Sequence, residues 1–143
     1  MHFASLSAVA LLAMASSAYA GSASVTNRCK QDLWVSITRA GPGETAHTFK
    51  LPTGRTWSES YQGTGNSIGV TTNPNYYSPD TAKLIWGYSD QPPMVYWSVN
   101  SVNGNIGLPF SVVAGDDCPG TNGFNGGKTL TCSDKENISL YVC

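Results

Sequence analysis

Four cysteines constrain this chain more than any other feature of its sequence. They are Cys29, Cys118, Cys132 and Cys143. All four follow a short apolar run over residues 8–15, which leads into Ala18-Tyr19-Ala20. This arrangement is typical of a secretory signal peptide with a small-x-small cleavage site. We therefore expect residues 1–20 to be removed and residues 21–143 to form one secreted domain, in which an even number of cysteines forms two disulfides.

The pairing of these cysteines stays open at this level, because four cysteines allow three connectivities. In the chain-entropy model a bridge between Cys29 and Cys143, which closes a loop of more than about a hundred residues, contributes roughly 4.7 kcal/mol to stability. A loop of about 15 residues, from Cys118 to Cys132, contributes about 3 kcal/mol. The chain has no Cys-x-x-Cys pair and only two histidines, so we expect neither a metal site nor a cofactor.

Short β-branched and aromatic runs, separated by Gly, Pro, Asn and Asp, fill the chain after residue 20. Leu33–Arg39 is one such run, and its strict alternation of apolar and polar residues indicates a half-buried strand. Similar runs occupy Ser22–Thr26, His47–Leu51, Arg55–Ser60, Ser67–Thr72, Lys83–Tyr88, Met94–Val99, Phe110–Val113, Thr129–Cys132 and Ile138–Cys143. About ten strands at this spacing predict an all-β fold, an antiparallel β-sandwich.

Several of these segments resemble those of a known family. Asn27-Arg28-Cys29, followed by Leu33-Trp34, resembles the first strands of thaumatin-like proteins, and residues 51–57 (LPTGRTW) resemble that family's Leu-x-x-Gly-x-Ser-Trp segment. Together with residues 83–88 and the last cysteine, the pattern is most similar to the small fungal Blastomyces yeast-phase-specific protein family, also described as antigenic thaumatin-like proteins. The resemblance implies a thaumatin-like core domain without the second domain of the large plant members. It also pairs Cys29 with Cys143 and Cys118 with Cys132.

The resemblance also bears on activity. Large thaumatin-like proteins that bind or cleave β-glucan have an acidic cleft, and Ser98 and Asn103 stand here where two of its aspartates fall. Glycoside hydrolysis needs two carboxylates about 5–9.5 Å apart. We therefore expect a secreted, non-enzymatic protein of the cell wall or cell surface, monomeric, that binds polysaccharide (β-glucan or chitin) or a host surface protein through exposed loops. Two alternatives remain: a weak β-glucan hydrolase using Asp116 or Asp117, and a secreted effector, antigen or adhesin.

Two loops carry the candidate ligand-binding residues. Tyr76 and Tyr77 lie between two prolines in the loop 73–80, and we expect both rings to be exposed and able to stack on sugars. We expect the four tryptophans to be buried. Asp116 and Asp117 lie in the glycine-rich loop 114–128, where a solvated turn is the ordinary interpretation and a share in an acid/base pair is the functional one.

The remaining signals exclude more than they indicate. A net charge of −1 without a basic patch argues against a nucleic-acid partner, and no later apolar run reaches the length of about 20 residues that spans a membrane. Gly65-Asn66-Ser67-Ile68-Gly69 matches the nucleophile-elbow pattern, but the residues after it cannot form the required helix. We expect His47 to face solvent.

One modification motif is present. Asn137-Ile138-Ser139 is the single Asn-x-Ser/Thr triplet, with x not proline, in the chain. Such a triplet is an acceptor for N-linked glycans in secreted proteins. It falls at the start of the last predicted strand, so glycosylation requires that Asn137 face solvent.

Overall fold

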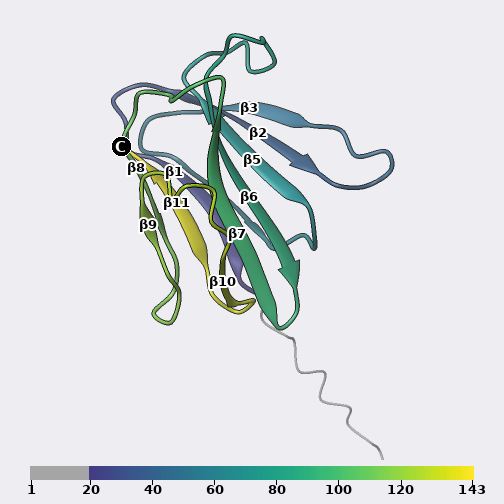
Figure 1. Cartoon of the computed structure of the whole chain (residues 1–143). Coiled ribbons are helices and arrows are strands. Elements are labelled where there is room, and N and C mark those ends of the chain that lie inside the picture. The colour runs from purple at the N-terminus through teal and green to yellow at the C-terminus, as the bar shows by residue number, and fades with distance from the viewer. Residues whose placement is uncertain (1–19) are drawn as a thin grey trace, which may run out of the picture.

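Two β-sheets packed face to face make up the protein, as a computed structural model that describes residues 20–143 shows (Figure 1). Residues 1–19 of the predicted signal peptide lie outside the described residues. The five-stranded sheet has the order β4-β1-β11-β8-β9, and the six-stranded sheet the order β10-β7-β6-β5-β2-β3. The strands are β1 (Ser22–Asn27), β2 (Leu33–Arg39), β3 (His47–Leu51), β4 (Thr56–Ser60), β5 (Asn66–Thr71), β6 (Lys83–Gln91), β7 (Met94–Val102), β8 (Phe110–Val113), β9 (Thr121–Asn122), β10 (Leu130–Ser133) and β11 (Ile138–Val142).

The predicted β-sandwich is confirmed, with two differences. All ten predicted strands are present within one to three residues at their ends. The structure has one strand that was not predicted, β9. It is two residues long and lies in the predicted loop 114–128, and so short a segment shows no detectable alternation of apolar and polar residues. One pair of strands differs from the predicted antiparallel arrangement, because β1 pairs with β11 in parallel. Parallel neighbours need a long connection, and here the rest of the chain supplies it.

The core lies between the sheets, because alternate residues of each strand point inward. On β2 these are Leu33, Val35 and Ile37, all buried. The predicted burial of tryptophan is confirmed for Trp86 and Trp97, which are 0% and 1% exposed. The other two tryptophans, at positions 34 and 57, are half-buried, because each takes an outward or edge position in its strand.

The disulfide between Cys29 and Cys143 follows from the parallel pair of strands. Asn27 of β1 lies opposite Val142 of β11, so both strands run out at the same edge. The N–H of Arg28 donates to the carbonyl of Val142 at 2.9 Å. Cys29, two residues after Asn27, and Cys143, directly after Val142, are then close enough to bond, with their Cα atoms 4.9 Å apart. This bridge ties the first strand of the sandwich to the last.

The second disulfide, Cys118–Cys132, holds a long loop to the sandwich. Cys118 lies in the β8–β9 connection, whereas Cys132 points inward from β10 and is buried. β8 belongs to the five-stranded sheet and β10 to the six-stranded sheet. The bridge therefore also links the two sheets at their open edge. Both pairs are those that the family resemblance implies.

The side chain of Asn27, two residues before the first cysteine, has a structural role in the backbone around it. This side chain is fully buried. Its amide nitrogen donates to the carbonyls of Leu51 and Gln31, each at 2.9 Å, and its amide oxygen accepts from the N–H of Cys29 at 2.9 Å. One side chain thus satisfies three backbone groups from three segments, which a buried apolar residue would leave unpaired.

Gly54, in the segment 51–57, stabilises the same corner through its backbone conformation. Gly54 has a positive φ of 74°, a conformation that is costly for any residue with a side chain. This conformation closes the turn before β4, where the N–H of Arg55 donates to the carbonyl of Pro52 at 3.1 Å. The N–H of Gly54 donates to the carbonyl of Asn27 at 2.8 Å. The two sequence motifs therefore meet in space at one corner of the sandwich.

In the described part of the chain, no helix is long and apolar enough to cross a membrane.

The lengths of the loops that the two disulfides close predict how much each disulfide contributes to the free energy of unfolding. The residues joined by Cys29–Cys143 are 114 apart and those joined by Cys118–Cys132 are 14 apart. We expect the Cys29→Ala/Cys143→Ala variant to lose about 4–5 kcal/mol of unfolding free energy and the Cys118→Ala/Cys132→Ala variant about 3 kcal/mol. Denaturant unfolding under non-reducing conditions measures both. A larger loss from the second pair would contradict this account.

Asn27→Ala should cost about 3 kcal/mol, because it removes three hydrogen bonds and leaves buried backbone groups unpaired. Asn73→Ala is the matched control. Its side chain accepts a single hydrogen bond, from the N–H of Asn75 in an exposed loop, so its loss should stay below about 1 kcal/mol. Equal losses for the two variants, measured by denaturant unfolding, would show that the buried asparagine is not the corner's anchor.

Candidate functional site

The predicted aromatic pair, Tyr76 and Tyr77, folds back over the outer face of the six-stranded sheet. Tyr77 is 64% exposed, as predicted. Its hydroxyl group hydrogen-bonds to that of Ser36 on β2 at 3.0 Å, and Thr48 on β3 donates to the Ser36 hydroxyl at 2.9 Å. The ring is therefore held at one end by the sheet, while its face remains open to solvent.

Tyr76 is half-buried, so the prediction that it is exposed is wrong. The reason is Gly69 on β5. A Cβ atom at this position would lie 1.6 Å from the hydroxyl oxygen of Tyr76, so the missing side chain makes a socket for the phenol. Burial, and then the neighbouring Tyr77, raises the pKa of the Tyr76 hydroxyl to about 12. Tyr76 is thus the anchor of the loop, and its edge supports Tyr77 at a ring-centroid distance of 5.1 Å.

Lys83 completes the attachment of this loop. It is buried, and its ammonium group donates to the carbonyls of Thr81 at 3.0 Å and Ser78 at 3.3 Å. The same nitrogen lies 5.4 Å from the centroid of the Tyr76 ring, a cation–π distance. A loop with these contacts presents its outer ring in one position.

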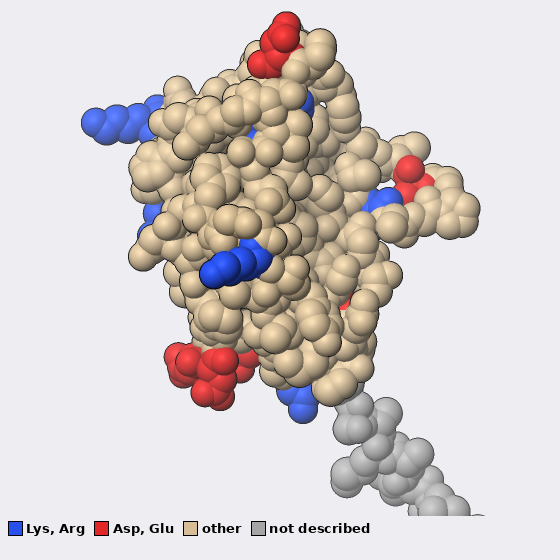
Figure 2. All heavy atoms as spheres, viewed as in Figure 1, with Lys and Arg blue, Asp and Glu red and all other residues tan. Residues whose placement is uncertain are grey.

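The second predicted pair, Asp116 and Asp117, lies elsewhere. Both residues are exposed, in the β8–β9 connection. Figure 2 shows acidic side chains gathered at the end of the molecule where this connection lies in Figure 1. The tyrosine loop folds over the other sheet, so the structure does not bring the two predicted pairs into one site.

In the described part of the chain, Asp90 has a second carboxylate, that of Asp134, near enough to affect the pKa of Asp90. Burial, and then the charge of Asp134, raises the pKa of the Asp90 carboxyl. One oxygen of each group is shielded from solvent. Among residues 20–143, no three His, Cys, Asp or Glu side chains are placed to hold a metal ion. His47 is exposed, as predicted, with its ring stacked on Phe49.

The outer face of the six-stranded sheet has an unusual surface. Two rows of side chains run across its strands, an upper row and a central row. The upper row consists of Thr48, Ser36, Gly69, Ile85 and Asn100, and the central row of Thr38, Ser67, Gly87 and Ser98. Every member is uncharged, and most are small and carry a hydroxyl group or no side chain. We call these two rows, together with Tyr77 and Tyr96, the outer face.

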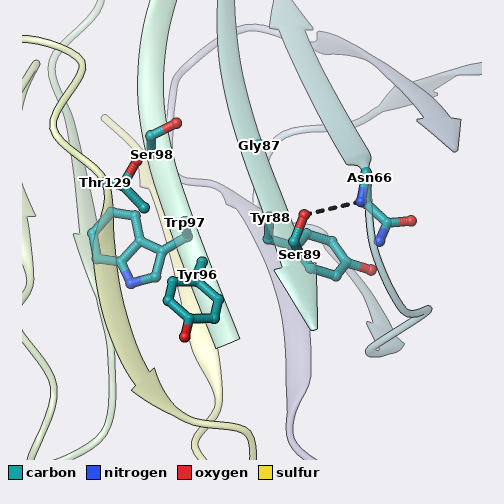
Figure 3. Close-up of a pocket in the computed structure, with 9 residues that line it drawn as sticks. Asn66, Gly87, Tyr88, Ser89, Tyr96, Trp97, Ser98 and Thr129 are labelled. Carbon is teal, nitrogen blue, oxygen red and sulfur yellow. Dashed lines mark hydrogen bonds between the residues drawn. The ribbon is translucent and has the colours of Figure 1, made fainter. Parts of the chain in front are cut away.

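Tyr96 stands at the far corner of this face from Tyr77. It points outward from β7, is 39% exposed, and pairs with Ser89 in the row after the central one. A hollow of about 240 Å³ opens beside it, with Gly87, Ser98 and Thr129 among its lining residues (Figure 3). Ser36, beneath Tyr77, and Tyr96 are three strands and two rows apart, roughly 20 Å on ordinary strand spacings. Ser36 and Gly69 of the upper row are buried beneath the tyrosine loop. The open part of the outer face, which we call the trough, is therefore the uncharged central row with the hollow beside Tyr96, and it has an exposed tyrosine at each end.

The outward position of Tyr96 could have been predicted from the sequence, but the predicted binding residues were all in loops. Val95, Trp97 and Val99 are apolar, so strict alternation on β7 places Tyr96 and Ser98 on the opposite side. The small residues of β5 and β6 gave no such signal. Only the registers of four strands show that Gly87 and its neighbours form one row.

Two further hollows, each of about 350 Å³, lie at the other sheet. The more apolar of them is lined by Leu108, Pro109, Phe110 and Phe124. Phe124 is 38% exposed and packs edge-on against Phe110. This surface presents an exposed aromatic ring beside other apolar side chains.

Comparison with known proteins relates the fold to two solved structures. The protein elicitor MoHrip2 from Magnaporthe oryzae superposes with a TM-score of 0.69 at 20% identity, over 87% of this chain and 99% of that one. The thaumatin-like xylanase inhibitor TLXI superposes with a TM-score of 0.62 at 14% identity, over 85% of this chain and 98% of that one. These likenesses establish a thaumatin-like fold. No curated protein matches the chain.

The sequence itself matches one family model, that of the Blastomyces yeast-phase-specific protein, over residues 10–143. This range includes the Asn27 corner, both disulfides and all eleven strands. The chain therefore belongs to the Blastomyces yeast-phase-specific protein family.

Proposed function

We propose that this protein is a secreted, non-enzymatic protein that binds a neutral polysaccharide on its outer face. The observation that carries the proposal is the uncharged trough between Tyr77 and Tyr96. Sugars present hydroxyl groups and flat C–H faces, which hydrogen-bond to small polar side chains and stack on aromatic rings. A long polymer also needs an open, extended surface, and the trough crosses four strands.

The placement of the acidic residues supports a binding role over hydrolysis. Asp116 and Asp117 are adjacent and exposed in a turn, whereas glycoside hydrolysis uses two carboxylates that flank one bond. The described neighbours of this fold, an elicitor and an enzyme inhibitor, are named for effects on a partner. We infer the same mode of action here, outside the cell or at the wall.

The apolar hollow at Phe124 favours a second candidate function, the binding of a protein partner such as a host surface protein. An exposed phenylalanine beside Leu108 and Phe110 is the kind of anchor pocket that protein interfaces use. The two candidates use different sheets. Single substitutions can therefore separate them.

Tyr96→Ala should weaken retention on insoluble β-1,3-glucan or chitin at least about fivefold, since loss of a stacked ring costs about 1 kcal/mol. Tyr77→Ala should act in the same direction. Phe124→Ala is the matched control, because Phe124 and Tyr96 are almost equally exposed, 38% and 39%. Co-sedimentation isotherms give the dissociation constants.

Three results would count against the polysaccharide proposal. They are no retention of the wild type, equal retention of Tyr96→Ala and wild type, and a loss confined to Phe124→Ala, which would favour the protein partner. Sugar release from laminarin that disappears in Asp116→Asn or Asp117→Asn would instead establish a hydrolase.

Retention should also be nearly independent of salt. The outer face has no charged residue in its two rows. Raising the salt concentration from about 50 to about 500 mM screens surface charges and should leave the dissociation constant unchanged within about twofold. A steep fall with salt would identify a charged ligand and rule out this mode of binding.

A further inference from the structure

We infer that Asn137 carries an N-linked glycan and that this glycan stands on the side of the molecule opposite the outer face. The glycan site itself rests on the geometry at Asn137. The inference that the glycan orients the bound protein rests on the proposed polysaccharide binding. The experiments below keep the two apart.

The folded protein holds the amide of Asn137 in an orientation that can accommodate a glycan on its nitrogen. Asn137 is exposed and lies between the β10–β11 turn and β11. Its side-chain oxygen accepts hydrogen bonds from the N–H of Ser22 at 3.0 Å and from the Ser22 hydroxyl at 2.8 Å. A backbone N–H can only donate, so the atom that faces it must be the amide oxygen. The amide nitrogen, which bonds to the sugar, is therefore on the side away from Ser22.

The surroundings leave room for a bulky group. By alternation from Ser139 and Tyr141, Asn137 is on the outward side of β11. The neighbouring outward residues of β1 and β4 are small: Ser22 and Ser24 pair with Ser60 and Ser58. Ser24 donates to the hydroxyl of Ser139 at 2.8 Å. On the side of β1 and β4, the surface beside Asn137 is thus a layer of hydroxyl groups, over which a hydrophilic glycan can lie. On the side of β8, Ser139 lies opposite the exposed Val113.

The position relative to the binding face follows from the architecture. β11 is the central strand of the five-stranded sheet, and Tyr77 and Tyr96 are on the six-stranded sheet. The two sheets pack through their inner faces, so their outward sides point in opposite directions. A glycan on Asn137 would shield one side of the sandwich and leave the trough open, which gives the bound protein a preferred orientation with its glycan toward solvent.

N-glycosylation transfers an oligosaccharide from a lipid-linked donor to the side chain of Asn137. The amide nitrogen of Asn137 attacks the anomeric carbon of a lipid-pyrophosphate-linked oligosaccharide in the secretory pathway. A carbon–nitrogen bond forms, and the bond from the anomeric carbon to the pyrophosphate oxygen breaks. The nitrogen releases one proton to a base, and the lipid pyrophosphate is the leaving group.

Secretion of the full chain from a eukaryotic host tests the site. Intact mass before and after treatment with peptide N-glycosidase should fall by one N-glycan, and the treatment in heavy-oxygen water should leave a labelled aspartate at position 137. Asn137→Gln and Ser139→Ala should each abolish the shift, whereas Ser139→Thr keeps the acceptor hydroxyl and should preserve it. An unshifted mass for wild type and Ser139→Thr, both secreted and folded, overturns the inference.

A second glycan on the other sheet tests the orientation. Thr129→Asn completes an acceptor triplet with Leu130 and Thr131, beside the hollow at Tyr96. Its glycan should reduce retention on polysaccharide at least about tenfold, whereas enzymatic removal of the glycan at Asn137 should change retention less than twofold. The Thr129→Asn/Thr131→Ala variant carries the same asparagine without an acceptor and separates the glycan from the substitution.

Oxidative footprinting supplies a readout that does not need polysaccharide binding. Deglycosylation at Asn137 should leave the labelling rates of Tyr77 and Tyr96 unchanged. A rise in either rate would show that the glycan reaches the outer face, and it would overturn the proposed separation even if the mass shift is found. If the mass shift and these rates agree with the inference while wild type fails to bind polysaccharide, the proposed function fails alone.

Discussion

The parallel pairing of β1 and β11 is the constraint on which the rest of the structure depends. It joins the first and last strands of the sandwich, places Cys29 beside Cys143, and encloses every other strand between the joined ends. Asn27 strengthens the same corner by satisfying the backbone at Gln31, Cys29 and Leu51. A chain with few charged residues and many glycines has a large conformational entropy to overcome, and closing a loop of this length removes much of it from the unfolded state.

Alternation along the strands then divides the molecule into three layers with different chemistry. Inward residues such as Val35, Trp86 and Trp97 form an apolar core. The outward residues of both sheets are largely serine, threonine, glycine and asparagine. The outward surfaces of the two sheets are therefore alike in polarity. They differ in the number of aromatic residues, and only one of them has the glycan acceptor. This difference, and not the acidic loop, is the basis on which we propose binding for one sheet and modification for the other.

Glycine has a structural role in the proposed binding face that its neighbours in sequence do not suggest. Gly69 accepts the phenol of Tyr76 in the space of its missing side chain, and this attachment positions Tyr77. Gly87 leaves the floor of the hollow beside Tyr96 open. A larger residue at the first position would displace the tyrosine loop, and a larger one at the second would fill the trough. The proposed binding thus depends on the absence of a side chain at these two positions.

The sequence by itself determined the all-β fold, the ten longer strands, the exposure of Tyr77 and His47, and the burial of Trp86 and Trp97, because these follow from alternation and local turn residues. Only the tertiary structure decided the parallel pairing of β1 with β11, the burial of Tyr76 against Gly69, and the separation of Asp116 and Asp117 from the tyrosines. Each of these depends on which distant strands become neighbours and in which register. Strand pairing is a long-range choice, and no local pattern in the chain encodes it.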